Sequence, residues 1–259
     1  MDIQAPLTLF VDEAGASDFG NPQPGARRKS HVVVAVAVPT IAFPGLLRIL
    51  PKNEAGKLLK SSCRDFHPGL AMPFVQRLIQ SQVDVGAFMV NTGDHDNIQL
   101  AADRARIANE RRKAAREEEA STGGKAEHPD IRPHDLHYLS FLPRAVFACL
   151  EIHTVRSMGR MPSFVDFVID SKQIDEFQKQ RFVSEMRRIC DEQGLRIGRF
   201  DWRKEEAEPL LLLPDLFGGI LCREERFRDE PAARLLWDAE GDGRFQFDNK
   251  PPPQSESVR

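Results

Sequence analysis

The stretch LTLFVDEAG, residues 7–15, joins a short apolar run to two acids, an alanine and a glycine. A short apolar run with polar residues at its end is typical of a buried strand, which we expect at 7–12. Asp12 and Glu13 then stand at the end of that strand. A buried carboxylate is costly unless a metal ion or several hydrogen-bond donors compensate its charge. The stretch therefore predicts a buried strand that carries carboxylates into a site.

Further segments with strand and helix patterns follow along the chain. Two strands come first, and strands then alternate with helices, an order that favours an α/β fold with a mixed sheet flanked by helices. The expected strands are 7–12, 31–38, 83–90, 164–170 and 195–202. The expected helices are 70–80, 97–119, 135–158, 175–193, 209–222 and 232–239.

The chain of 259 residues is long enough for one large core. We expect a single domain over 1–248, with a helical and disordered insertion around 97–133 where a charged helix runs into a glycine-containing break. The tail, 249–259, is rich in proline and serine, and we expect it to be disordered.

The composition limits the classes of partner and compartment. A net charge of −3 gives no overall attraction for nucleic acid, so any such binding must come from local patches. The four cysteines are far apart and form no CxxC pair, which is ordinary for a reducing cytosol. The chain shows neither a signal-peptide pattern nor a spanning apolar helix, and we expect a cytoplasmic protein without membrane contact.

Three acids from distant segments share an apolar context. Asp12 ends the first strand, Asp170 ends the strand FVDFVID, and Asp215 lies within LLLLPDLFGGIL. If they converge, their oxygens would suit a hard cation such as Mg²⁺ or Mn²⁺. The alternative for each acid is local, because a single Asp often caps a turn. Asp215, directly after Pro214, also fits the first turn of a helix.

Several short motifs in order resemble the domain-of-unknown-function 3800 family, over roughly residues 7–222. DEAGA at 12–16 resembles the opening signature of that family, and the apolar strand after it resembles the family's second strand. The remaining matches are Lys60-Ser61-Ser62, FVID at 167–170 and LLLPDLFGG at 211–219.

That family is similar to RNase H-like nucleases and integrases, so the resemblance implies a mixed sheet with acids grouped on one side. It also implies a metal-dependent nuclease, such as an anti-phage or mobile-element effector. By the resemblance, Asp12 would bind both of two metal ions, and Asp170 and Asp215 would complete the cluster. Glu13 would be an auxiliary acid or a cap. Lys60 would contact a phosphate or orient a carboxylate.

The chain departs from the family pattern at several positions. Ala16 stands where the signature has an acid, Ser171 follows the central Asp in place of a basic residue, and Pro214 replaces an alanine. These changes motivate an alternative function, a binding or scaffold subunit of weak or absent activity that acts with a protein partner.

Basic residues before the last long helix offer a local patch for nucleic acid. The patch is predicted from Arg187, Arg188, Arg199, Arg203 and Lys204. The arginine-rich segment 103–119 has nearly as many acids, and we interpret it as a solvated helix with (i, i+4) ion pairs. The sequence therefore predicts hydrolysis of DNA or RNA phosphodiesters by acids with basic residues nearby.

Overall fold

The computed structural model describes most of the chain, in several stretches. These are 6–15, 30–52, 56–60, 73–78, 83–91, 95–121, 133–157, 162, 164–171, 176–222 and 245–248. The helix expected at 232–239, the tail from 249 and the end of the expected insertion, 122–132, lie outside the described residues.

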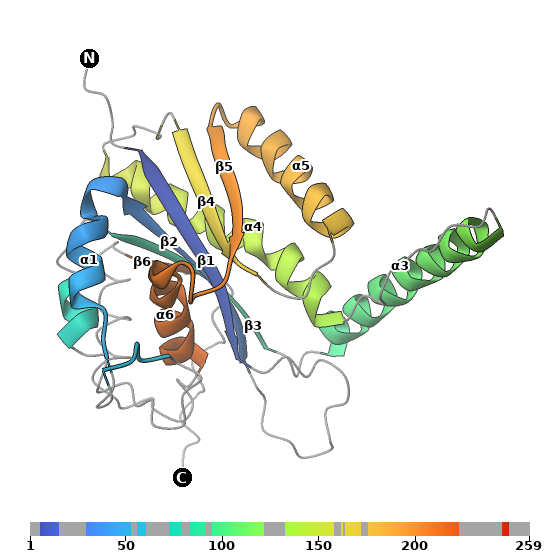
Figure 1. Cartoon of the computed structure of the whole chain (residues 1–259), viewed down its shortest axis with the longest axis horizontal. Coiled ribbons are helices and arrows are strands. Elements are labelled where there is room, and N and C mark those ends of the chain that lie inside the picture. The colour runs from blue at the N-terminus through green and yellow to red at the C-terminus, as the bar shows by residue number, and fades with distance from the viewer. Residues whose placement is uncertain are drawn as a thin grey trace, which may run out of the picture.

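A six-stranded sheet in the order β5-β4-β1-β2-β3-β6 forms the centre of the molecule (Figure 1). Strand β2 is antiparallel to β1 and β3, whereas β4 is parallel to β1, β5 to β4 and β6 to β3. The sheet is therefore mixed, and the predicted α/β class is confirmed. The strands are β1 (Leu7–Gly15), β2 (Ser30–Pro39), β3 (Asp84–Asn91), β4 (Phe164–Asp170), β5 (Arg196–Arg203) and β6 (Phe245–Asp248).

Helices cover both faces of this sheet. The helices are α1 (Phe43–Ile49), α3 (His95–Ser121), α4 (Pro133–Arg156), α5 (Glu176–Glu192) and α6 (Leu212–Cys222), with 3-10 turns η1 (Thr40–Ala42) and η2 (Pro209–Leu211). Residues 73–78 are also helical. Helices α4 and α5 pack on one face and α1 and α6 on the other, while α3 extends away from the body (Figure 1).

The central strands are apolar because both of their faces are covered. Along β1, Phe10 points into the core under α6, and its neighbours Leu9 and Val11 point into the core under α4. Along β2, residues 32–38 are all fully buried, which explains the unbroken run VVVAVAV. This alternation assigns each later residue of β1 to a known face.

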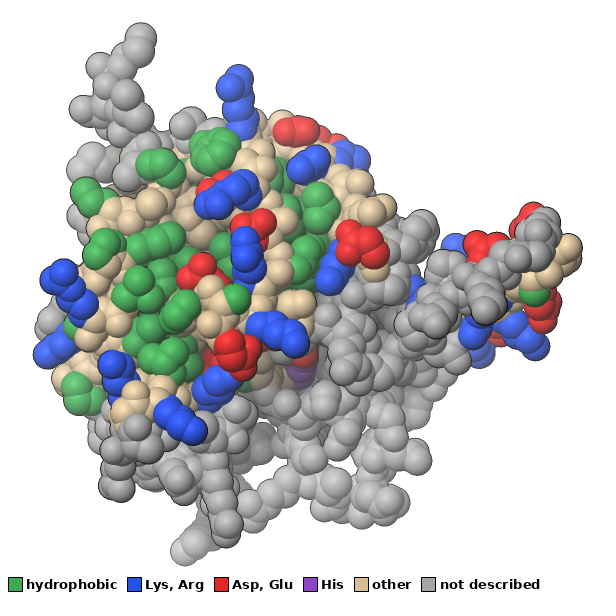
Figure 2. All heavy atoms as spheres, viewed as in Figure 1, with side chains coloured by type: hydrophobic (Ala, Val, Ile, Leu, Met, Phe, Trp, Pro, Cys, Tyr) green, Lys and Arg blue, Asp and Glu red, His purple; other side chains and the backbone are tan. Residues whose placement is uncertain are grey.

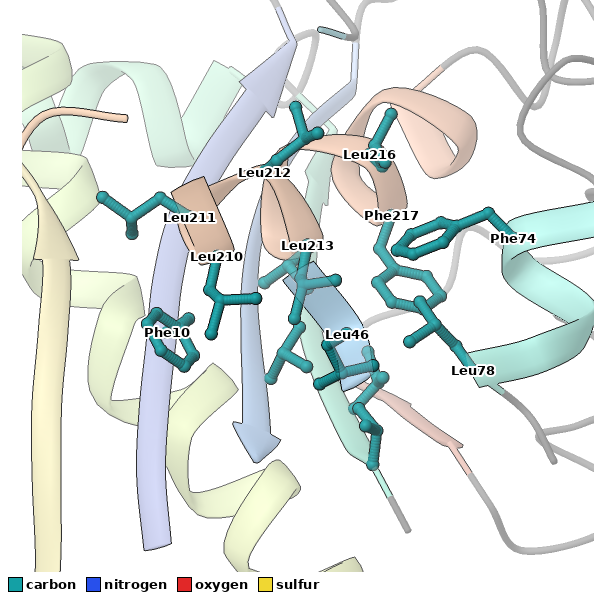
Figure 3. Close-up of a cluster of buried hydrophobic side chains, with 14 of the residues drawn as sticks. Phe10, Leu46, Phe74, Leu78, Leu210, Leu211, Leu212, Leu213, Leu216 and Phe217 are labelled. Carbon is teal, nitrogen blue, oxygen red and sulfur yellow. The ribbon is translucent and has the colours of Figure 1, made fainter. Parts of the chain in front are cut away.

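The core on the α6 side fixes that helix against the sheet. Figure 3 shows Leu210 and Leu213 above the strands near Phe10, and Phe217 beside the aromatic ring of Phe74. Leu210 and Leu213 are fully buried, and Phe217 is 1% exposed. The position of the first turn of α6 is therefore determined by packing around it.

Two details differ from the expected elements. The segment expected as one helix at 209–222 divides into the turn η2 and helix α6, because Pro214 has no N–H to donate to the carbonyl oxygen of Leu210, as one continuous α-helix would require. Strand β6 has only four residues and pairs with β3, which is a long-range contact that no local sequence pattern predicts.

Candidate metal centre

Asp12 lies on β1 and faces the α6 side of the sheet. Phe10, two residues earlier, belongs to the core on that side, and side chains two apart along a strand share a face. Asp12 is only 4% exposed. Its Oδ1 accepts the backbone N–H of Glu13 at 2.7 Å. A buried carboxylate thus stands where the sequence predicted one.

Asp170 ends the neighbouring strand β4 on the same face. Val168, two residues earlier, is in the core under α6. The parallel register pairs Val11 with Ile169, so one step further Asp12 and Asp170 are level with each other. Neighbouring strands are about 4.8 Å apart. Asp170 is half-buried beside Asp12.

Asp215 comes from the first turn of α6 and is 7% exposed. The helix can approach β1 closely at this point because Gly218 has no side chain. A Cβ at Gly218 would lie 2.7 Å from the Cβ of Ala14. Pro214 and Asp215 both suit a first helical turn, where an acid is stabilised by the helix dipole. Asp215 can therefore stabilise the first turn of α6 and also belong to a site shared with Asp12 on β1.

Glu205, which sequence reasoning missed, lies between β5 and η2. One oxygen from each of Asp12, Glu205 and Asp215 lies within 4.8 Å of the other two, and we name these three residues the acidic group. The pKa of Glu205 is raised above its usual value, chiefly by burial, while Lys60 opposes the shift and the charges of Asp215 and Asp170 add to it. Asp170 is therefore electrostatically part of the same centre.

The spacing of these oxygens fits a hard divalent cation. An octahedral Mg²⁺ holds its oxygens at about 2.0–2.1 Å, so opposite ligands are about 4.2 Å apart. Oxygens within 4.8 Å of one another need only small side-chain rotations to reach that geometry. Carboxylates are also the ligand type that Mg²⁺ and Mn²⁺ prefer. The acidic group therefore has the donors and the dimensions for such an ion.

Lys60 contacts this centre through an acid. Its Nζ forms an ion pair with Glu205 Oε2 and lies 3.4 Å from Glu206 Oε1. The pKa of Lys60 is raised, first by its hydrogen bond to Glu205. Lys60 was expected to contact a phosphate or to orient a carboxylate, and in the structure it contacts a carboxylate.

Glu13 lies apart from the acidic group. It is the next residue after Asp12 on a strand, so its side chain points to the α4 face of the sheet. There its Oε2 is 3.2 Å from Nε2 of His31, which is 2% exposed. The structure thus separates Glu13 from the acids with which the sequence grouped it.

The predicted basic residues divide between two places. Arg203 and Lys204 are exposed at the end of β5, and Arg203 lies 3.5 Å from Asp201. Arg199, on the same strand, is 3.0 Å from Asp166. Figure 2 views the α6 side and shows basic and acidic side chains interleaved there. Arg187 and Arg188 instead lie exposed on α5, which packs on the opposite face of the sheet.

A sequence signal for Glu205 did exist. It is an acid shortly after an expected strand, in the run RKEEAEP that joins 195–202 to the last long helix. The next residue, Glu206, is also a glutamate, so the sequence does not distinguish the two. The fold does, because the side chain of Glu205 is 14% exposed and that of Glu206 is 73% exposed.

Within the described part of the chain, no helix has the length and apolar character needed to span a bilayer. Comparison with protein-family models and with curated proteins gave no match.

Proposed function

We propose that this chain is a metal-dependent nuclease that hydrolyses phosphodiester bonds of DNA or RNA. The observation that carries the proposal is the acidic group, in which three carboxylates from distant parts of the chain have oxygens within 4.8 Å. A protein gains no stability from crowding buried carboxylates, so the arrangement calls for a cation to bind there. Mg²⁺ and Mn²⁺ are the ions that we assign.

The mixed sheet supports an RNase H-like fold for this nuclease. The resemblance to the domain-of-unknown-function 3800 family implies acids grouped on one side of such a sheet. Asp12 on β1 and Asp170 at the end of the parallel neighbour β4 face the α6 side, and Asp215 approaches from α6 itself. The RNase H-like assignment therefore rests on the order of the motifs and on this placement together.

The residues have distinct tasks in the proposed reaction. A bound divalent cation would polarise the phosphoryl oxygens and make a water molecule more acidic. The acidic group holds that cation, and Asp170 is level with it on β4. Arg203 and Lys204, exposed beyond β5, offer positive charge to the phosphates of a bound strand. In the reaction, water adds to phosphorus, the bond to the leaving oxygen breaks, and that oxygen gains a proton.

A nuclease assay with matched variants tests the proposal. We expect cleavage of labelled DNA or RNA with Mg²⁺ or Mn²⁺ and none with EDTA. Asp12→Asn should lower the cleavage rate by about 100-fold or more, because even residues that only hydrogen-bond to metal ligands contribute about 10–100-fold to activity. Asp191→Asn removes an exposed carboxylate on α5 and serves as the control. Equal cleavage by all proteins, with and without EDTA, would overturn the assignment.

One contact favours a second candidate, a binding or scaffold subunit that acts with a protein partner. Lys60 already forms an ion pair with Glu205, so part of the charge in the acidic group is neutralised from within the chain. Calorimetry distinguishes the two candidates. Absence of heat on titration with Mn²⁺, together with retained binding of nucleic acid or of a protein, would favour the scaffold.

A further inference from the structure

Strand β5 contains a β-bulge at the level of Asp166 on β4. Val165 pairs with Ile197, whereas Phe167, two residues further along β4, pairs with Phe200, three residues further along β5. One extra residue in a strand moves every later side chain of that strand to the opposite face of the sheet. The bulge therefore decides which face each residue of β5 occupies from Phe200 onward.

The carboxylate of Asp166 binds the bulge directly. Its Oδ1 accepts the backbone N–H of Arg199 at 2.8 Å, and its Oδ2 accepts Nε–H and Nη2–H of the same arginine at 3.2 and 3.0 Å. Asp166 is 9% exposed. The other residue of the bulge is Gly198, where a Cβ would clash with Oδ1 of Asp166 and with the ring of Phe164. The backbone of β5 is thus shaped to receive this carboxylate.

The register after the bulge positions two residues of the proposed site. It pairs Arg203 with Asp170, so Arg203 is on the α6 face of the sheet. The N–H of Ser171 then donates to the carbonyl oxygen of Arg203 at 2.6 Å, and the turn that follows brings Glu205 to the acidic group. Without the extra residue, Arg203 would face the α4 side and the turn would be displaced by about 3.3 Å along the strand.

Aromatic packing after the bulge favours the same register. The ring of Phe200 stacks on that of Phe167 at 4.8 Å between centroids, and the ring of Trp202 meets that of Phe182 at 6.0 Å. These contacts hold β5 on the α4 face beyond the bulge, whereas Asp166 binds the bulge itself from the α6 face. The bulge could therefore depend on the packing alone or also on the carboxylate, and the two cases give different results on substitution.

We propose that Asp166 is a positioning residue for the metal centre, which it serves by holding the β5 bulge, and this inference rests on the proposed function. Asp166 precedes Asp170 by four residues on β4, which is about 13 Å along a strand. Charges at this separation are largely screened at physiological ionic strength, where the Debye length is about 8 Å. Asp166 therefore acts on the acidic group through the backbone of β5 and the position of Glu205.

Titration calorimetry with Mn²⁺ on the full chain tests this role through the Kd. Asp166→Ala should weaken Mn²⁺ binding by about tenfold, the lower end of the effect of residues that orient metal ligands. Asp166→Asn loses the same charge but keeps an oxygen for the N–H of Arg199, so it should bind Mn²⁺ nearly as tightly as the unchanged protein. Gly198→Ala, which displaces the carboxylate, should weaken binding as Asp166→Ala does.

Asp191→Ala, at an exposed acid on α5, is the control and should leave the Kd unchanged. Circular dichroism and thermal melts confirm that each variant is folded at the temperature of the titration. An unchanged Kd in folded Asp166→Ala and Gly198→Ala would show that packing alone holds the bulge, and would overturn the role of Asp166 while leaving the nuclease standing.

Equal weakening by Asp166→Asn and Asp166→Ala would also overturn the role, because the effect would then follow the charge and not the hydrogen bond to the bulge. No Mn²⁺ bound to the unchanged protein would overturn the proposed function and this inference together.

Discussion

The buried acids oppose the stability of the fold when no cation is bound. Asp12 and Asp215 are 4% and 7% exposed, and their oxygens lie within 4.8 Å of each other. Like charges at this distance repel with an energy of about 1–4 kcal/mol at the dielectric constants found near protein surfaces. Sites that bind ligands commonly give up stability in this way.

Asp12→Asn is therefore expected to stabilise the metal-free protein. Asn keeps an oxygen that can accept the N–H of Glu13 but removes the repelling charge. A gain of about 1 kcal/mol corresponds to a rise in Tm of about 2–4 °C for a chain of this size. Thermal melts in EDTA measure it, with Asp191→Asn as the control. A clear fall in Tm for Asp12→Asn would contradict the repulsion.

Cys149 and Cys190, the free cysteines among the side chains that the structure describes, should be unreactive in the folded protein. Burial raises the pKa of Cys190 to about 11 and that of Cys149 further, so deprotonation is disfavoured in both. At pH 8 a thiol with a pKa of about 11 is a thiolate roughly one part in a thousand, and the thiolate is the nucleophile. Iodoacetamide mapping by mass spectrometry should show both labelled only after unfolding in guanidinium. Rapid labelling of either in the native protein would refute this.

At the scale of elements, glycines set how closely helices approach the sheet. Helix α4 passes over β3 at Gly86, where a Cβ would lie 2.3 Å from the backbone N of Cys149 and 2.5 Å from the carbonyl oxygen of Ala145. Both contacts are with backbone atoms, which cannot turn aside as a flexible side chain can. The helix as a whole would have to move.

Gly86→Ala should consequently destabilise the protein by about 1–3 kcal/mol or more, the usual effect of overpacking. Gly45→Ala is the matched control, because Gly45 lies in α1 with no atom within 4 Å of its added Cβ. Alanine is favoured over glycine in a helix by about 1 kcal/mol, so Gly45→Ala should be neutral or stabilising. Urea unfolding gives both free energies, and equal effects would reject the close packing of α4.

The elements differ in how far the sequence predicts them. The core strands and the long helices were predictable because their periodicity reflects burial, as in the VVVAVAV run of β2. Helix α1 and the four-residue β6 were not, since α1 is only seven residues long and β6 forms by pairing with a distant strand. Such pairing is a property of the fold and leaves little local pattern.

Only some of the acids in the candidate site could be predicted from the sequence. Asp12, Asp170 and Asp215 stand out because each interrupts an apolar run. Glu205 does not, since its neighbours are charged and its burial arises only when the turn after β5 reaches the other acids. The family resemblance implied that Glu13 is an auxiliary acid or a cap, yet the alternation of a strand sends its carboxylate and that of Asp12 to opposite faces of the sheet.

At the scale of the whole molecule, a cation at the acidic group would join β1, the turn after β5 and α6. Binding to the native state alone stabilises it by about 2.7 kcal/mol when the free ion is at 100 times its Kd. Mn²⁺ should therefore raise Tm by about 5–10 °C, and EDTA should reverse the shift. An equal shift in Asp12→Asn would show that the ion binds elsewhere.

The most direct test of the central claim is the anomalous scattering of a crystal of this protein soaked in Mn²⁺. We expect a manganese peak bounded by oxygens of Asp12, Glu205 and Asp215, with Lys60 still against Glu205. A map with no peak between these oxygens at saturating Mn²⁺, or coordinates in which the three carboxylates point away from one another, would contradict it.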